Sequence, residues 1–329
     1  MHSIYVFDTM KFTVEYLPRL QTTTVYADIP INNLNVELNG TKLALNGEDI
    51  DVIQGITKPV ISKVPVSSSL TCVKIQPEKI EVLRNADDLS VDRYQWNIGD
   101  FKGNYSLYCK SCNNCVMSSK NVSKIMPMPS SLWYEMVDYW HCHKPHEDGP
   151  VKYMKRFNQL VPRERGVIVG SYFFIINPGD WNLLAVDEEL FCQCGEVLGD
   201  KDFTFGNYKL LKWKLSLSNH KYDDYNMVYC RFFEEIKYTA GRIFTLTIRE
   251  RKVCIWCFGF DIDVNINGTI MRKALKILFK DTAEVQGEEL DLEYELPYVA
   301  FLKHIEMVNA SLLEHLQTYK EWKVSYIPQ

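Results

Sequence analysis

Three kinds of pattern are missing from this sequence: long hydrophobic runs, basic tracts and the common catalytic signatures. No run of about 18 apolar residues predicts a membrane-spanning helix. The first residues, MHSIYVFDTMKF, have neither the basic nor the apolar region of a secretory signal. Basic residues number 37 and acidic residues 42, so the formal net charge is −5. We therefore expect no membrane partner and no direct nucleic-acid partner.

The absent signatures include the phosphate-binding loop, the dinucleotide fingerprint, the H-E-x-x-H zinc motif and the G-x-S-x-G nucleophile elbow. Each of these motifs places a reactive or phosphate-binding group on a defined turn or helix. Without them, the sequence offers no simple assignment to nucleotide-dependent enzymes, zinc proteases or serine hydrolases. The sequence does not decide whether the protein is an enzyme, but the missing motifs favour a non-catalytic protein.

What is present is a chain of 329 residues, 46% hydrophobic and 13% aromatic, which is long enough for two domains. The 19 tyrosines and 16 phenylalanines favour β-sheet. The chain also has ten cysteines. Without a secretory signal we expect a reducing compartment, where short cysteine spacings indicate metal binding rather than disulfides.

We predict an α+β, β-rich fold in three parts. Residues 1–105 form an N-terminal antiparallel β module, in which Asn39-Gly40 is typical of a hairpin turn. Residues 106–200 form a split zinc ribbon that carries an inserted helix. Residues 201–329 form a C-terminal α+β domain.

Hydrophobic periodicity assigns several segments. Residues 225–238 and 298–319 are expected to be helices, and residues 322–327 a closing strand. Residues 271–280, MRKALKILFK, fit either a helix or a strand. Residues 167–177, VIVGSYFFIIN, are expected to form one buried strand.

Two short cysteine pairs stand far apart in the sequence. Cys109 and Cys112 have C-x-x-C spacing, with Cys115 three residues further on, and Cys192 and Cys194 have C-x-C spacing. Two such pairs separated by a large insertion are typical of a split zinc ribbon. A reading as four unrelated buried thiols stays open.

Backbone geometry favours one set of ligands. A zinc knuckle turns tightly after its second cysteine and needs a residue there that tolerates positive φ. Asn113 follows Cys112 and Gly195 follows Cys194, whereas β-branched Val116 follows Cys115. We therefore predict that a structural zinc is bound, with Cys115 left as a spare or buried thiol. The predicted ligands are Cys109, Cys112, Cys192 and Cys194.

Between the two pairs, residues 126–145 read MPMPSSLWYEMVDYWHCHKP. The spacing predicts a short amphipathic helix that ends in a cysteine between two histidines. Its apolar face docks either on the core of this chain or on a partner protein. The candidate partner-binding residues are Trp133, Met136, Val137, Trp140, His141, Cys142 and His143.

Two further hypotheses attach to single residues. Cys142 beside His141 or His143 fits a metal ligand or, less well, a nucleophile, because sequence neighbours seldom adopt nucleophile–base geometry. Three lysines around Trp213 are the candidate surface for an RNA-binding module. These lysines are Lys209, Lys212 and Lys214.

The segments LYCKSC, MPMPSSLWYEMVDYWHCHKP, GSYFFIIN, CGEVLG and NASLLEHLQTYKEWKVSYI occur in the order seen in one known family. From about residue 105 to its end, the chain resembles the HECT-like ubiquitin-conjugating-enzyme E2-binding family. The fungal member of that family is known for its importance in polyadenylation. The W-x-C-H ending of the tryptophan helix is the most specific of these motifs.

The resemblance implies two functions. One is ubiquitin ligase activity with an E2 partner. The other is binding to the endonuclease subunit of the pre-mRNA cleavage and polyadenylation machinery, a metallo-β-lactamase-fold enzyme with two zinc ions. In the second role the resemblance makes Cys142 the thiol presented to the nuclease's metal centre, with Trp133 and Trp140 positioning the helix.

The position of the last cysteine helps to choose between them. A HECT-type ligase carries its thioester cysteine close to the C-terminus, and here the last cysteine is Cys257, in an apolar segment. We therefore predict a non-catalytic binding or chaperone factor for the endonuclease in mRNA 3′-end processing. It would act in the cytoplasm and nucleus. The alternative is a HECT-like E3 ubiquitin ligase that binds an E2.

Overall fold

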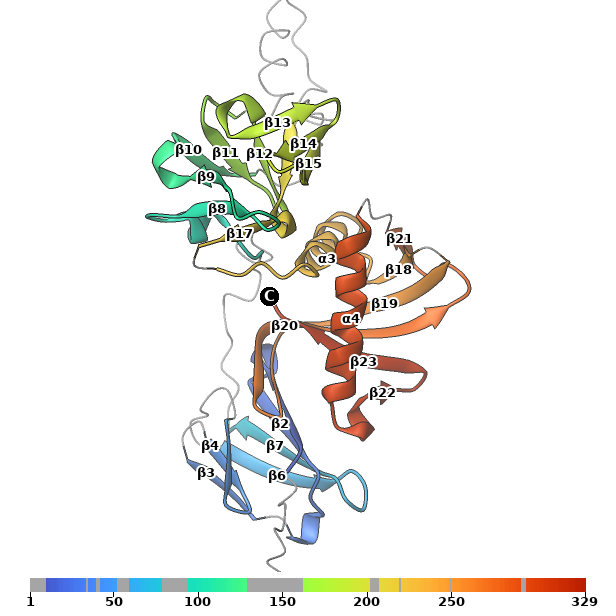
Figure 1. The fold of residues 1–329 in the computed structure, drawn as a ribbon. Helices are drawn as coiled ribbons and strands as arrows, with labels where there is room; N and C mark the ends of the chain where they lie inside the picture. Colours follow the sequence, from blue (N-terminus) through green and yellow to red (C-terminus); the bar gives the residue numbers. More distant parts are fainter. Residues whose placement is uncertain are drawn as a thin grey trace, which may run out of the picture. The chain divides into compact units, whose positions relative to one another are not determined.

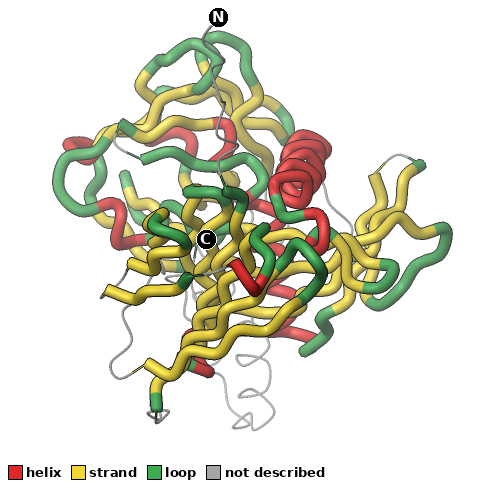
Figure 2. The backbone as a smooth tube through the Cα atoms, turned by 90° about the horizontal axis from the view of Figure 1, so that it is seen from below, coloured by secondary structure: helices red, strands yellow, loops and turns green. Residues whose placement is uncertain are grey.

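The computed structural model describes residues 10–33, 35–39, 42–51, 59–78, 94–128, 162–201, 207–218, 220–248, 250–290 and 294–329. Strands and connecting loops make up most of this part of the chain (Figure 1, Figure 2). It divides into two compact units built from segments that are far apart in sequence. Unit 1 combines Met1–Asp88, Gly241–Glu295 and Leu302–Gln329, and unit 2 combines Leu89–Ala240 and Leu296–Phe301.

Unit 1 is dominated by one ten-stranded sheet, in the order β22-β23-β20-β19-β1-β2-β7-β6, with β18 and β21 attached beside β19. Its pairs are antiparallel apart from β18 and β21. The strands β3, β4 and β5 form a separate three-stranded sheet. The strands of unit 1 are β1 (Phe12–Leu17), β2 (Thr22–Ala27), β3 (Val36–Asn39), β4 (Lys42–Leu45), β5 (Glu48–Asp51), β6 (Pro59–Pro65), β7 (Thr71–Pro77), β18 (Ile243–Ile248), β19 (Arg251–Ile266), β20 (Thr269–Thr282), β21 (Glu288–Leu290), β22 (Thr318–Tyr319) and β23 (Trp322–Ile327).

The long strand β19 bends the main sheet into an antiparallel half barrel. Its register with β20 shifts around Gly259 and Ile262, and Asp261 between them has a φ of 58°. Such bulges insert unpaired residues and increase the local bend of a strand. The first part of β19 therefore pairs with β18, and its last part pairs with β1.

Two apolar clusters form the core of unit 1. One lies where β1, β2 and β7 pack against the β3–β5 sheet, and it includes Val14 and Leu43. The other includes Val308 of helix α4 (Glu295–Ser311) and Trp322 of β23. Among the described residues, neither helix is long and apolar enough to cross a membrane.

Unit 2 contains a seven-stranded sheet, β10-β11-β12-β16-β15-β14-β13, and a three-stranded sheet, β17-β8-β9. The pairing is antiparallel except between β10 and β11. Its elements are β8 (Ser106–Cys109), β9 (Cys115–Ser118), β10 (Lys124–Pro127), β11 (Gly166–Val169), β12 (Phe173–Ile176), β13 (Leu183–Val186), β14 (Glu189–Cys192), β15 (Val197–Lys201), β16 (Tyr208–Leu211), β17 (Leu215–Leu217) and α3 (Asn226–Thr239).

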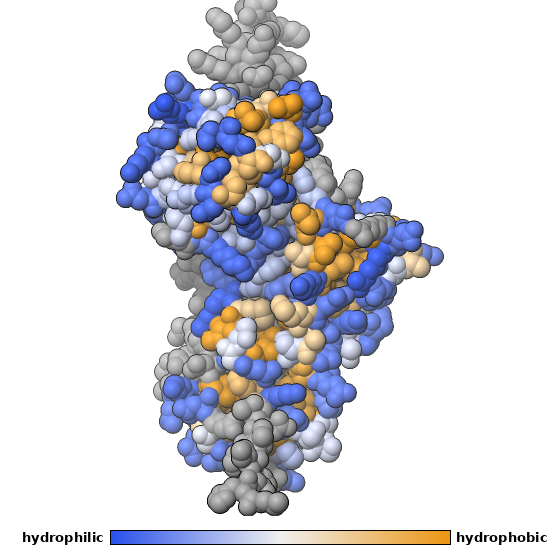
Figure 3. Space-filling view, in the orientation of Figure 1, coloured by the Kyte–Doolittle hydropathy of each residue, from blue (hydrophilic) through white to orange (hydrophobic). Residues whose placement is uncertain are grey.

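Short 3-10 helices complete the described part of both units. They are η1 (Pro18–Leu20), η2 (Ile31–Asn33), η4 (Ile98–Phe101), η5 (Ser119–Asn121), η6 (Pro178–Asp180), η7 (Lys212–Lys214) and η8 (Glu314–Leu316). At one edge of unit 2, β13 leaves Leu184 and Val186 exposed. Figure 3 shows apolar side chains gathered in the region of β13 and β14.

The helices and the closing strand of the C-terminal part occur where the sequence predicts them, with one difference. Helix α4 ends at Ser311 instead of continuing to residue 319. The side-chain amide of Asn309 donates to the carbonyl oxygens of Gln317 and Val324, at 2.7 and 2.8 Å. These bonds hold the chain after the helix in a turn, so that β22 and β23 can pair.

The structure also decides one assignment that the sequence left open and corrects another. Residues 271–280 lie in β20, because pairing with β19 on one side and β23 on the other decides a pattern that is locally ambiguous. The predicted single strand 167–177 is a hairpin of β11 and β12. Its turn begins at Gly170, where a Cβ atom would come within 2.9 Å of the Phe173 ring.

The hairpin of β3 and β4 is present, with Asn39 paired to Lys42, and Gly40 of the predicted turn lies outside the described residues. The predicted boundaries at residues 105 and 200 differ from the two units. β1 and β23 belong to one sheet, and Thr13 of β1 pairs with Ile266 of β19, about 250 residues further on. Pairing across so long a separation leaves no signal in local periodicity.

Candidate metal centre

Each of the two cysteine pairs lies in the turn of a β-hairpin of unit 2. Cys109 ends β8 and Cys112 lies in the turn before β9, while Cys192 ends β14 and Cys194 lies in the turn before β15. The two hairpins belong to different sheets. The cysteine site therefore joins the two sheets of unit 2.

The two turns are closed in corresponding ways. The backbone N–H of Asn113 donates to the Cys109 carbonyl, and that of Gly195 donates to the Cys192 carbonyl, both at 2.9 Å. The φ angles of Asn113 and Gly195 are 60° and 87°, as the sequence predicts for the residue after the second cysteine of a knuckle. The second turn is one residue shorter, in keeping with its C-x-C spacing.

The four sulfur atoms lie within 4.8 Å of one another and could hold a metal ion. The Sγ atoms of Cys109 and Cys194 are 4.0 Å apart, and those of Cys112 and Cys192 are 3.6 Å apart. A tetrahedral zinc with Zn–S bonds of about 2.3 Å requires sulfur–sulfur distances of about 3.8 Å. A disulfide would need about 2.05 Å. The donor set therefore fits zinc.

The surroundings affect the thiols unequally. Burial raises the pKa of Cys192 to about 12, which disfavours its thiolate. The backbone N–H of Glu196 lowers the pKa of Cys194. A bound divalent cation would deprotonate both thiols, since metal coordination outweighs such local effects.

Unit 2 also contains a buried lysine, Lys212, which the sequence analysis assigned to a candidate basic surface. Lys212 of η7 is 0% exposed. Its Nζ lies within 2.7 to 3.2 Å of four backbone carbonyl oxygens, those of Gln95, Trp96, Gly170 and Ser171, and the ammonium group can donate to three of them at a time. Burial lowers the pKa of Lys212 to about 7. This side chain joins three separate segments of unit 2.

These contacts remove the proposed RNA-binding surface. Trp213 is buried like Lys212, and Lys214 forms an ion pair with Glu196 at 2.7 Å. Lys209 lies over the Phe173 ring at 5.3 Å. Because Lys212 and Trp213 point into the protein, the exposed basic and aromatic surface that the hypothesis required does not exist here.

The remaining cysteines fall into three groups. Cys72, Cys230, Cys254 and Cys257 are buried. Cys115 is exposed, so its reading as a buried thiol is wrong. The tenth cysteine, Cys142, lies outside the described residues. So do the other predicted partner-binding residues, Trp133, Met136, Val137, Trp140, His141 and His143.

Comparison with known proteins gives a match over residues 15–324 to the family described as HECT-like Ubiquitin-conjugating enzyme (E2)-binding. An uncharacterized protein of Saccharomyces cerevisiae is 26% identical over 96% of this chain and 99% of its own length. Two E3 ubiquitin-protein ligases, from Rattus norvegicus and Homo sapiens, are 33% and 28% identical, each over 22% of this chain and 17% and 16% of their own lengths. No solved structure matches.

Proposed function

Because the chain belongs to the HECT-like ubiquitin-conjugating enzyme (E2)-binding family, we propose that it acts by binding partner proteins, an E2 among them, and is not itself a catalyst. The observation that carries this proposal is the closed set of four sulfur donors. A metal held by four protein sulfurs has no open position for a substrate. We propose that the metal is zinc and that it is structural, since the sulfur spacing suits a tetrahedral zinc.

We propose further that residues 126–145 bind the endonuclease subunit of the pre-mRNA cleavage and polyadenylation machinery. Support comes from the sequence motif and the family resemblance. A thiol such as Cys142, flanked by imidazoles, is a strong ligand for an open zinc position in a partner. In this role the protein would chaperone or cap the metallo-β-lactamase-fold enzyme, in the cytoplasm and then in the nucleus.

Affinity purification from native extract tests the choice of partner. The wild type would be compared with a Cys142→Ala, Trp140→Ala double variant, with Cys115→Ala as the matched control for loss of an exposed thiol. We expect the endonuclease to be recovered with the wild type and the control and lost with the double variant. Retention by the double variant would contradict the proposed role of the motif.

The name of the rat and human relatives, E3 ubiquitin-protein ligase, favours a second candidate function for this chain, that of an E3 ligase. In a HECT-type reaction, a cysteine thiolate attacks the thioester carbonyl of the E2–ubiquitin conjugate. A new thioester forms and the E2 cysteine leaves as a thiolate. This step needs an accessible thiol. Among the described cysteines outside the four-sulfur site, Cys115 alone is exposed, so Cys115 and Cys142 are the two candidates.

Mixing the protein with ubiquitin-charged E2 and separating the products without reductant distinguishes the two functions. A reductant-sensitive ubiquitin adduct that is lost with Cys115→Ala or Cys142→Ala would establish the ligase. Binding of the E2 with no adduct is the result expected for a binding protein.

A further inference from the structure

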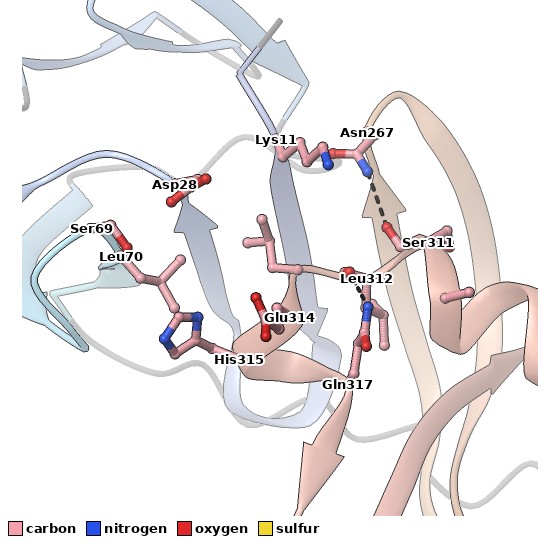
Figure 4. A pocket seen from close by; sticks show the side chains of 12 residues that line it. Lys11, Asp28, Ser69, Leu70, Asn267, Ser311, Leu312, Glu314, His315 and Gln317 are labelled. Carbon is pink, nitrogen blue, oxygen red and sulfur yellow. Dashed lines mark hydrogen bonds between the residues drawn. The ribbon is translucent and has the colours of Figure 1, made fainter. Parts of the chain in front are cut away.

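Unit 1 contains a cavity of about 500 Å³ that none of the functions above uses. Its walls come from the residues at the end of helix α4, from η8, from Asn267 in the turn between β19 and β20, and from Leu70 before β7 (Figure 4). All its lining residues belong to unit 1. Its volume lies in the range of about 300–1,000 Å³ that is typical of ligand sites.

Side-chain amides hold the walls in place. Asn267 accepts a hydrogen bond from the Phe12 N–H at 2.8 Å and donates to the Ser311 carbonyl at 3.1 Å. Gln317 donates to the Leu312 carbonyl at 3.1 Å. Because these amide groups are engaged within the protein, they shape the cavity and leave recognition to the charged groups around it.

Four titratable side chains line the cavity: Lys11, Asp28, Glu314 and His315. Within the described part of the chain, none of their side chains forms a hydrogen bond or ion pair. Other carboxylates of unit 1 do find cationic partners, such as Asp281 with Arg251 at 2.7 Å. All four of these side chains are exposed to solvent, so charges of both signs surround a hollow that is open at the protein surface.

The positively and negatively charged side chains lie at different places around the cavity. In Figure 4 the Lys11 chain extends toward Asn267, and the labels place Asp28, Glu314 and His315 away from that end. The end of α4 also lines the cavity at Ser311. The C-terminus of a helix carries partial negative charge, which adds to the two carboxylates in favouring a cation.

We propose that this cavity binds an arginine or lysine side chain presented by a peptide of a partner protein. Asp28 and Glu314 would accept hydrogen bonds from the cationic group, and Lys11 would donate to a carbonyl oxygen of the same peptide. Arginine suits the two carboxylates better than lysine, because its planar guanidinium offers several donors in a fixed geometry. The site is independent of the four cysteines and of residues 126–145.

Calorimetric titration of the full chain tests the proposal with two peptides, acetyl-Ala-Arg-Ala-amide and the same peptide with citrulline in place of arginine. Citrulline keeps the shape of the side chain and removes its charge. We expect the arginine peptide to bind at least about tenfold more tightly, since hydrogen bonds between charged groups are the stronger ones. Methylguanidinium, which keeps the cationic group and lacks any carbonyl oxygen for Lys11, should bind more weakly than the arginine peptide.

Variants assign the effect to residues. Asp28→Asn combined with Glu314→Gln should abolish the preference for arginine over citrulline. Lys11→Met should weaken both peptides by the same factor, because Lys11 contacts the peptide backbone. Glu284→Gln, at an exposed carboxylate of unit 1 outside the cavity, should change neither affinity.

Three results would overturn the proposal: equal affinity of the wild type for both peptides, no binding of the arginine peptide at millimolar concentration, or an unchanged preference in the double variant. The comparison of two peptides on the wild type does not depend on how the variants fold. Failure here would also leave the endonuclease, E2 and zinc proposals untouched, because they concern other residues.

Discussion

Units 1 and 2 both join segments that are distant in sequence, but they do so by different physics. Unit 1 uses long runs of backbone pairing, as where β19 pairs with β20 and with β1, and it fills the space between sheets with apolar side chains. Unit 2 combines shorter runs of pairing with point contacts: four sulfur atoms from its two sheets lie within 4.8 Å of one another, and one lysine contacts segments that are distant in sequence. A single substitution should therefore damage unit 2 more than unit 1.

The largest expected effect is at the metal site. Cys192→Ser, or a strong chelator, should destabilise unit 2 severely, since structural zinc contributes on the order of 10 kcal/mol to folding at neutral pH. Segment-resolved hydrogen exchange should show protection lost in β8, β9, β14 and β15 and retained in β19 and β20. Cys115→Ser is the matched control and should leave both units protected. An equal loss of protection in both units would contradict the expectation that unit 2 depends more on a single site than unit 1 does.

The next effect is at Lys212. Lys212→Met should lower the free energy of unfolding of unit 2 by about 3–5 kcal/mol, because it leaves several buried carbonyl oxygens without donors, at about 1–3 kcal/mol each. Chemical denaturation measures this difference, with Lys120→Met on the exposed face of η5 as control. A change as small as that of the control would mean that water replaces the ammonium group at little cost.

Unit 1 should respond more mildly to the loss of a core side chain. Leu278 is 2% exposed and packs in the cluster with Trp322. Leu278→Ala should cost about 3 kcal/mol, the usual range for removing a buried leucine. Hydrogen exchange should report the loss in unit 1 and leave the protection of unit 2 unchanged. Loss of protection in unit 2 as well would show that the two units unfold together.

The last prediction concerns pH, and its effect is the smallest when it is taken per pH unit. The pKa of Lys212 is about 7 in the folded protein, against an ordinary value of 10.5. Between these values the unfolded chain binds a proton that the folded chain does not. The free energy of unfolding should therefore rise with pH above 7, by at most about 1.4 kcal/mol per pH unit.

Lys212→Met removes this slope while keeping the nearby Cys230, Asp100 and Glu234. The difference between the wild type and the variant from pH 7 to 10 therefore isolates the lysine. A flat difference would indicate that the four carbonyl oxygens keep Lys212 protonated throughout this range.

The sequence predicted features whose cause is local. Asn113 and Gly195 were recognisable because a positive φ after a knuckle cysteine restricts the residue type, and their angles agree. The sequence could not predict that Lys212 is buried. A lysine next to a tryptophan gives the same local sequence pattern whether it lies on a basic surface or is buried among backbone carbonyl oxygens. The pairing of β1 with β19 was also invisible, since the register depends on residues about 250 positions apart.

The most direct test of the structural role of the cysteines is the zinc content of the purified full chain, measured by elemental analysis. We predict about one zinc per chain in the wild type and in Cys115→Ser, and none when Cys109, Cys112, Cys192 and Cys194 are all replaced by serine. Absence of zinc from the wild type, or its retention by the fourfold variant, would contradict the proposal that a zinc ion bound by these four cysteines joins the two sheets of unit 2.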